Sequence, residues 1–270
     1  MMKTGYLIRP FGQDAADIDV DFQQPCRPLL VTQVLQYCTQ KEDGEEITEG
    51  FFQDLPVGER IKALLAIDAL TTRGTTESPG LLLRLHCQEE TCNELIEIEI
   101  TKEEILAAQS KEPGNDTGIY PIPINGKEYF FRKPTGRDQL EWLKSTFTDE
   151  RTAAETIIRT LWVPSDENKS EPEPSFTGEG VEAVNDRMRN IDPLVHFELT
   201  VHCPVCNHEN HYVPDLECLL IQKLHKVQLD LLQTIHRLAS HYHWSEQQIL
   251  AISPHRRAYY LTLVEKEKTV

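Results

Sequence analysis

Two pairs of cysteines in matching surroundings constrain this chain more than any other feature. The pairs are Cys87 with Cys92 and Cys203 with Cys206. Each pair follows a run in which every second residue is apolar, and such alternation predicts a β-strand. An asparagine, a second strand-like run and a helix start come after each pair. The order strand, cysteine turn, strand, helix therefore occurs twice.

The duplicated order separates three interpretations of the Cys-Pro-Val-Cys stretch. A thioredoxin-type redox pair lies at a helix N-terminus, where the helix dipole lowers the thiol pKa, but here a β-like run follows Cys206. Two facing turns can instead supply four thiolates to one tetrahedral zinc ion. We therefore predict a single structural zinc held by Cys87, Cys92, Cys203 and Cys206. Two alternatives remain: the cysteine turns have lost their metal, or the cysteines have a redox function.

The first turn is the weaker half of this prediction. Four residues, Gln-Glu-Glu-Thr, separate its cysteines, and its two glutamates add negative charge beside four thiolates. Four histidines are alternative ligands, although solvent-facing strand positions are more usual for them: His86, His202, His208 and His211. An odd count of seven cysteines argues against a disulfide framework. The other three are expected to be small buried side chains: Cys26, Cys38 and Cys218.

The composition narrows the class of protein. The chain has 270 residues, of which 39% are hydrophobic, and a formal net charge of −17. Such a charge repels phosphate backbones, so we expect no nucleic-acid partner. No apolar run reaches the roughly 18–20 residues that cross a bilayer, and the first residues lack the apolar segment of a signal peptide. We therefore expect a cytoplasmic protein without a membrane partner.

The sequence predicts an α+β fold in which the two cysteine units form a zinc-ribbon-like element. Asn125-Gly126, between two alternating runs, indicates a central type I′ β-hairpin. A long amphipathic helix should run from Asp215 to about Tyr242, because apolar residues recur there at steps of three and four. That stripe comprises Leu220, Leu224, Val227, Leu231, Ile235, Leu238 and Tyr242.

Local signals divide the chain into five segments. Capping pairs such as Thr101 with Glu104 mark helix starts, and the run Glu150–Val163 indicates a helix. Charges, prolines and glycines over 165–180 cannot build a core. The segments are 1–45, poorly determined; 46–115, a helix and the first cysteine unit; 116–164, the hairpin and helices; 165–180, an acidic surface loop; and 181–270, the second cysteine unit and C-terminal helices.

Several motifs in the C-terminal half carry a resemblance. They are a Pro-Thr-Gly-x-Asp start, an Asp-Pro before the strand into Cys-Pro-Val-Cys, and a terminal pattern with paired arginines. These motifs resemble those of the T-even-type phage baseplate hub assembly family, most clearly over 118–264 and more loosely over 50–106. Asn207 stands where that family has glycine. The matching residues are Pro134, Thr135, Gly136, Asp138, Asp192, Pro193, Cys203, Cys206, Trp244, Ile249, Leu250, Pro254, Arg256, Arg257, Tyr260 and Leu261.

The resemblance implies a non-enzymatic role in building the baseplate hub of a contractile phage tail or bacterial injection system, as a chaperone-like factor or minor subunit. Partners would be hub, spike or tape-measure-type tail proteins. No P-loop, GxSxG, HExxH or glycine-rich nucleotide turn appears, so we expect no enzyme. The competing classes are a cytoplasmic zinc-ribbon adaptor unrelated to tails, and a thiol oxidoreductase that would need an exposed Cys203 or Cys206 of low pKa.

The last two helices are the expected docking surface, with Arg256, Arg257 and Tyr260 as its partner-binding residues. Both arginines fall in the first turns of the final helix. Cations there oppose the helix dipole, so the placement has no evident benefit within the fold. An acidic partner surface would explain it, and local pairing with Glu246 is the alternative.

Overall fold

A computed structural model describes residues 6–41, 47–73, 80–108, 118–164 and 176–268. It is an α+β structure in which helices dominate and the sheets are small and antiparallel. In chain order the elements are β1 (Tyr6–Ile8), α1 (Ala15–Ile18), α2 (Arg27–Cys38), β2 (Thr39–Lys41), α3 (Glu49–Asp54), α4 (Val57–Thr71), β3 (Leu81–His86), β4 (Leu95–Ile100), α5 (Lys102–Ala107), β5 (Ile119–Ile124), β6 (Lys127–Arg132), α6 (Gly136–Lys144), α7 (Glu150–Leu161), β7 (Trp162–Val163), α8 (Glu179–Ile191), β8 (Leu199–His202), β9 (Glu209–Tyr212), α9 (Leu216–Tyr242), α10 (Glu246–Leu250) and α11 (Pro254–Lys268).

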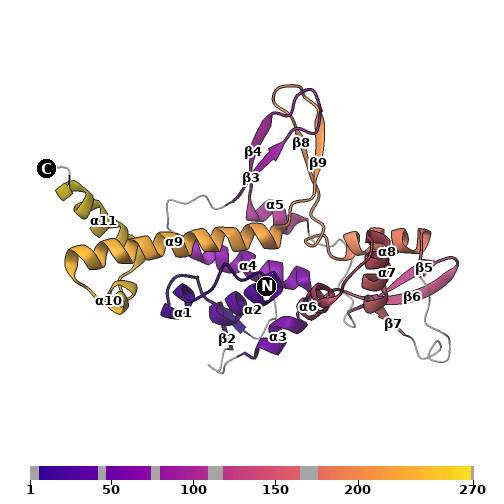
Figure 1. Cartoon of the computed structure of the whole chain (residues 1–270), viewed down its shortest axis with the longest axis horizontal. Coiled ribbons are helices and arrows are strands. Elements are labelled where there is room, and N and C mark those ends of the chain that lie inside the picture. The colour runs from indigo at the N-terminus through magenta and orange to yellow at the C-terminus, as the bar shows by residue number, and fades with distance from the viewer. Residues whose placement is uncertain (1–5, 42–46, 74–79, 109–117, 165–175, 269–270) are drawn as a thin grey trace.

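Helix α9 is the longest helix of the described residues and lies along the long axis of the molecule (Figure 1). Its 27 residues span about 40 Å at 1.5 Å per residue. The side chain of Asp215 caps its N-terminus by accepting the Cys218 N–H, and His243 ends it in the left-handed conformation at φ 56°. The predicted stripe faces inward: five of its seven residues are buried, and Val227 and Tyr242 pack at the margins of the core.

The main hydrophobic core lies where α9 meets the N-terminal helices. It gathers α2, α3 and α4, the first half of α9 and the base of the β3–β4 hairpin. The first 45 residues, which the sequence left poorly determined, contribute β1, α1, α2 and β2. Helix α2 places Cys38 in this core, as expected, while Cys26 and Cys218 are only half-buried.

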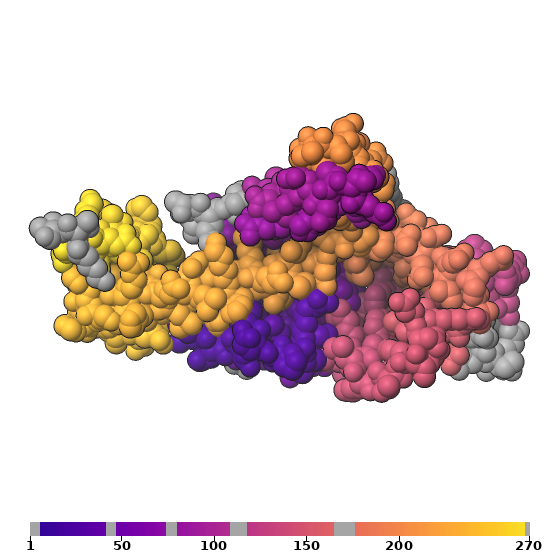
Figure 2. Space-filling model, turned by 45° about the horizontal axis from the view of Figure 1, so that its top comes forward, coloured from indigo at the N-terminus to yellow at the C-terminus, as the bar shows by residue number. Residues whose placement is uncertain are grey.

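Two β-hairpins project together from this body (Figure 1). Strand β3 pairs with β4 from Leu81–Ile100 to His86–Leu95, and β8 pairs with β9 from Leu199–Tyr212 to His202–Glu209. Figure 2 shows the two hairpins side by side above α9. Helix α5 follows the first hairpin behind the Thr101–Glu104 capping box, and α9 follows the second. The duplicated strand–turn–strand–helix order is therefore present.

A separate small core lies at the end of the molecule opposite the C-terminus (Figure 1). The β5–β6 hairpin turns at Asn125 and Gly126, both with positive φ as a type I′ turn requires. Residues Trp162 and Val163, expected to be helical, instead form β7, which pairs with β6 at Phe130 and Phe131.

The acidic loop expected over 165–180 needs a correction at its end. Its residues 165–175 lie outside the described residues. Phe176, however, is buried in the small core formed by β5, β6, α7 and α8, and α8 begins at Glu179. The ring of Phe176 packs against Tyr129 and Phe131. The free energy gained by burying this aromatic ring outweighs the polar character of the residues around it.

The C-terminal helices close the other end of α9. Helices α10 and α11 pack on its last turns through Leu238 and Ile249, with aromatic contacts among Tyr242, Trp244 and Tyr260. The Ser245–Gln248 capping box starts α10. In the described part of the chain, no helix combines the length and the hydropathy that a membrane crossing requires.

Candidate metal centre

The two cysteine turns have the same local construction. Cys87 ends the first strand of one hairpin and Cys203 the first strand of the other, and the backbone N–H of each closes the turn onto Glu94 O (2.8 Å) and His208 O (2.9 Å). Asn93 and Asn207, which follow the second cysteines, adopt φ of 46° and 60°. Asparagine tolerates this left-handed conformation better than most residues, which suits both positions to a tight turn.

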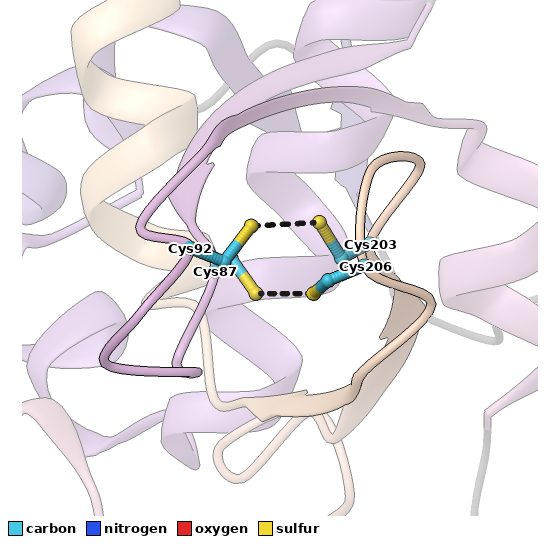
Figure 3. A group of neighbouring side chains, drawn as sticks. All are labelled: Cys87, Cys92, Cys203 and Cys206. Carbon is cyan, nitrogen blue, oxygen red and sulfur yellow. Dashed lines mark hydrogen bonds between the residues drawn. The ribbon is translucent and has the colours of Figure 1, made fainter.

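The four sulfur atoms form one compact cluster (Figure 3). Sγ of Cys87 lies 3.6 Å from Sγ of Cys206, and Sγ of Cys92 lies 3.7 Å from Sγ of Cys203. All four sulfurs lie within 4.8 Å of one another. These separations exceed a disulfide bond of about 2.05 Å, and the cysteines are free. A tetrahedral ion with metal–sulfur bonds of about 2.3 Å would place its sulfurs about 3.8 Å apart. The cluster therefore fits a metal.

Hydrogen bonds across the two hairpins fix this arrangement. The backbone N–H of Gln88 donates to Asn210 Oδ1 at 2.6 Å, and the side chain of Gln88 exchanges two bonds with the backbone of His211. Tyr212 Oη donates to His86 O at 2.6 Å. Asn210 is fully buried and also donates to Val201 O and His208 O. The sequence does not predict these contacts, because amide and tyrosine side chains occur in many roles and carry no spacing rule of the kind that paired cysteines have.

The charge balance of the cluster favours a cation. Backbone N–H groups of Cys206 and Val205 point at Cys203 and lower the pKa of its thiol to about 7. The backbone of Glu94 favours a thiolate at Cys92, yet burial and the three neighbouring sulfurs raise the pKa of Cys92 to about 12. Four thiols this close cannot all ionise without a positive charge among them. A divalent ion would supply that charge and let them bind as thiolates.

The four neighbouring histidines are not part of the cluster. All are exposed, and three lie near glutamates: His202 and His211 beside Glu209, at 3.7 and 3.3 Å, and His208 beside Glu89 at 3.4 Å. The contact of Glu89 with His208 also gives one of the two glutamates in the first turn a partner outside the sulfur cluster. Within the described residues, the four cysteines are the only group of metal-binding side chains close enough to share an ion.

The donor set determines what such a site can do. Four protein sulfurs complete a tetrahedral shell and leave no open position for water or substrate, which is the arrangement of structural sites. Sulfur ligands in this geometry suit zinc or iron–sulfur chemistry. Cys203, whose pKa is lowered, is only 2% exposed. Cys203 therefore lacks the accessibility that the redox interpretation requires, whereas Cys206 is exposed.

The three expected partner-binding residues occupy different environments. Arg256 is exposed and lies against Tyr260, with Nη2 3.3 Å from the Tyr260 hydroxyl, and that ring is half-buried against Trp244. Arg257 is only 6% exposed, which corrects the expectation of two exposed cations. Adjacent residues of a helix point about 100° apart. The side chains of Arg256 and Arg257 therefore lie on different faces of α11, and the side chain of Arg257 faces α9. Among the described side chains, neither arginine pairs with Glu246.

The geometry thus defines a class of site: a closed four-sulfur centre between two β-hairpins, carried on a largely helical body. Comparison of the chain with protein-family models, with curated proteins and with solved structures found no match. The function is therefore argued from the site, from the arrangement of the elements and from the motifs in the sequence.

Proposed function

We propose that this protein is a non-enzymatic assembly factor or minor subunit of the baseplate hub in a contractile phage tail or injection system, with one structural zinc ion. The observation that carries the proposal is the series of motifs that resemble the baseplate hub assembly family over residues 118–264. The partners would be hub, spike or tape-measure-type tail proteins met in the bacterial cytoplasm.

Several motif residues have structural roles at the junctions between helices. Thr135 and Asp138 form the capping box of α6, and Asp138 also binds Arg132 through two hydrogen bonds of 2.6 and 2.8 Å. Asp192 is buried at the N-terminus of α4, where the backbone of Gly58 donates to its carboxylate. These residues connect α4, α6 and α8. A chain that shares the pattern would need the same helix junction.

The arrangement of the molecule supports a scaffold role. Its hydrophobic core is divided into separate clusters, two of which include residues of α9. The hairpin pair, the β5–β7 sheet and the α10–α11 pair lie at different places on the surface (Figure 1). Large apolar side chains are exposed on α9 and α11, among them Leu229 in the middle of α9 and Tyr259 on α11, which is 62% exposed. Such a shape presents several surfaces to different partners.

The proposed zinc ion holds the two hairpins in a fixed position relative to each other. The small cluster of buried residues between the hairpins consists of Cys87, Ile96 and Cys203, which is too little apolar surface to fix two hairpins. A structural zinc contributes to folding directly. The rigid hairpin pair would then be a second contact surface beside α10 and α11.

A deletion strain tests the assembly role. It should produce sheaths or tubes without functional baseplates, seen by electron microscopy and loss of infectivity or secretion. Arg256→Glu should reproduce the defect in a folded protein, because it reverses an exposed charge on the docking surface. Arg151→Glu is the matched control, since Arg151 is exposed on the distant helix α7. Normal particles in the deletion strain would reject the assembly role and favour the zinc-ribbon adaptor.

A further inference from the structure

Arg257 is a buried cation without an anion. It is 6% exposed, and its Nη1 atom is shielded from solvent and makes no hydrogen bond. No carboxylate in the described part of the chain lies within ion-pair distance of its guanidinium. The other buried cations of the described residues differ in this respect: Arg60 pairs with Glu217, and Lys102 pairs with Asp68 at 2.9 Å.

An unpaired guanidinium inside a protein is unfavourable. It loses its hydration, and nothing replaces the lost interactions unless a carboxylate or another acceptor reaches it. Burial accordingly lowers the pKa of Arg257, although an arginine stays protonated at any physiological pH. An anion that reached Arg257 would offset this cost.

The space beside Arg257 can hold that partner. A pocket of about 220 Å³ lies where α11 meets α9 and the end of α4. A water molecule occupies about 30 Å³, so the pocket accepts a side chain rather than a single water. Its walls are mostly apolar, and the hydroxyls of Thr71 and Thr234 already donate to Ile67 O and Asp230 O. The lining residues are Thr71, Val227, Asp230, Leu231, Thr234, Pro254, Arg257, Ala258 and Leu261.

We propose that this pocket binds a glutamate or aspartate side chain from a partner protein, in a segment where an aliphatic residue flanks the acid. Arg257 would anchor the carboxylate, and Val227, Leu231 and Leu261 would contact the aliphatic group. One cation suits a carboxylate better than a phosphate dianion, and Asp230, which also lines the pocket, repels a singly charged carboxylate less than a doubly charged phosphate. The inference deepens the proposed docking role of α10 and α11 and rests on it for the existence of a partner.

The test uses the purified full-length protein and short peptides. The probes are acetylated, amidated peptides Gly-Ser-Leu-Xaa-Leu-Ser-Gly, with Xaa as Glu, Gln or phosphoserine, titrated while the Arg257 Nε–Hε signal is followed by NMR. The Glu peptide should move that signal and bind at least tenfold more tightly than the Gln peptide. Equal affinity for Glu and Gln, or tighter binding of the phosphoserine peptide, would overturn the proposal.

Two variants complete the test. Arg257→Met should abolish binding of the Glu peptide and raise the melting temperature by about 2–5 °C, because it removes an uncompensated buried charge. Arg151→Met, an exposed position on the distant helix α7, should leave both nearly unchanged. A lower melting temperature for Arg257→Met would mean that Arg257 is a structural residue with a partner of its own, and would reject the proposal. Because these measurements need no tail particle, they can fail or succeed independently of the deletion strain.

Discussion

At the scale of single residues, the junction of α2, α3, α4 and α6 depends on Arg60. Its side chain is fully buried and donates to Pro28 O at 2.7 Å and to Phe52 O at 3.2 Å. Burial lowers the pKa of Arg60, and the carboxylate of Glu217 opposes that effect. Gly136 lies directly against this guanidinium, and a Cβ atom there would overlap Arg60 Nη1. The glycine of the Pro-Thr-Gly motif is therefore required by packing.

Gly136→Ala should lower the free energy of unfolding by about 1–3 kcal/mol, the usual cost of overpacking a buried site. Gly50→Ala is the matched control, also near a helix start. Its Cβ would lie 3.8 Å from the nearest atom, Arg137 Nη2, so the change should be neutral or stabilise by up to about 1 kcal/mol. Urea unfolding followed by circular dichroism measures both. Equal effects for the two variants would mean that Arg60 can move aside.

At the scale of elements, α9 connects the main core to the core beside α10 and α11 by one buried face, which between Leu224 and Leu238 is apolar except at Gln228. Leu224 is fully buried in the main core, and Leu238 is fully buried beside α10 and α11. Between them, Gln228 donates from one amide nitrogen to the carbonyls of Asp17, Ile18 and Val20. The helix thereby also satisfies the C-terminal end of the short helix α1.

Leu224→Ala should destabilise the protein by about 2–5 kcal/mol, because it leaves a cavity in the main core. Leu229→Ala on the same helix should change the stability by less than about 0.5 kcal/mol, since Leu229 is 45% exposed. Denaturant midpoints at constant slope give both values. Similar losses for the two leucines would contradict the position of the buried stripe.

The elements that the sequence predicts are those with a local cause. Capping residues, the Asn125-Gly126 turn and the stripe of α9 act within a few residues, and the structure has each of them. Strand β7 has no such signal, because Trp162 and Val163 continue a helical pattern and become a strand only by pairing with Phe130 and Phe131. The burial of Arg257 likewise depends on how α11 packs on α9.

The candidate site was predictable for a different reason. Two cysteine turns of the same kind can together supply four thiolates to one tetrahedral ion. Their chemistry therefore predicts a contact between positions more than a hundred residues apart. The structure brings Cys87, Cys92, Cys203 and Cys206 together. The hydrogen bonds of Gln88 and Asn210 that support them were not predictable, because amide side chains of this kind occur in many roles and carry no spacing rule.

At the scale of the whole molecule, the hairpin pair is the part with the least core of its own. The body has an extended hydrophobic core, whereas the hairpins share a small cluster built around the cysteines. Removal of the proposed zinc should therefore loosen residues 86–94 and 202–212 while α9 and the N-terminal helices keep their structure. We expect the fold of this region to depend on the zinc centre.

Zinc analysis combined with X-ray absorption spectroscopy of the purified protein tests that claim most directly. We expect about one zinc per chain, with four sulfur neighbours at about 2.3 Å. Cys203→Ser should lose most of the zinc, and Cys218→Ser should keep it, because Cys218 lies outside the cluster. A folded, metal-free protein whose two hairpins remain packed together, or a shell with fewer than four sulfurs around the zinc, would contradict the account.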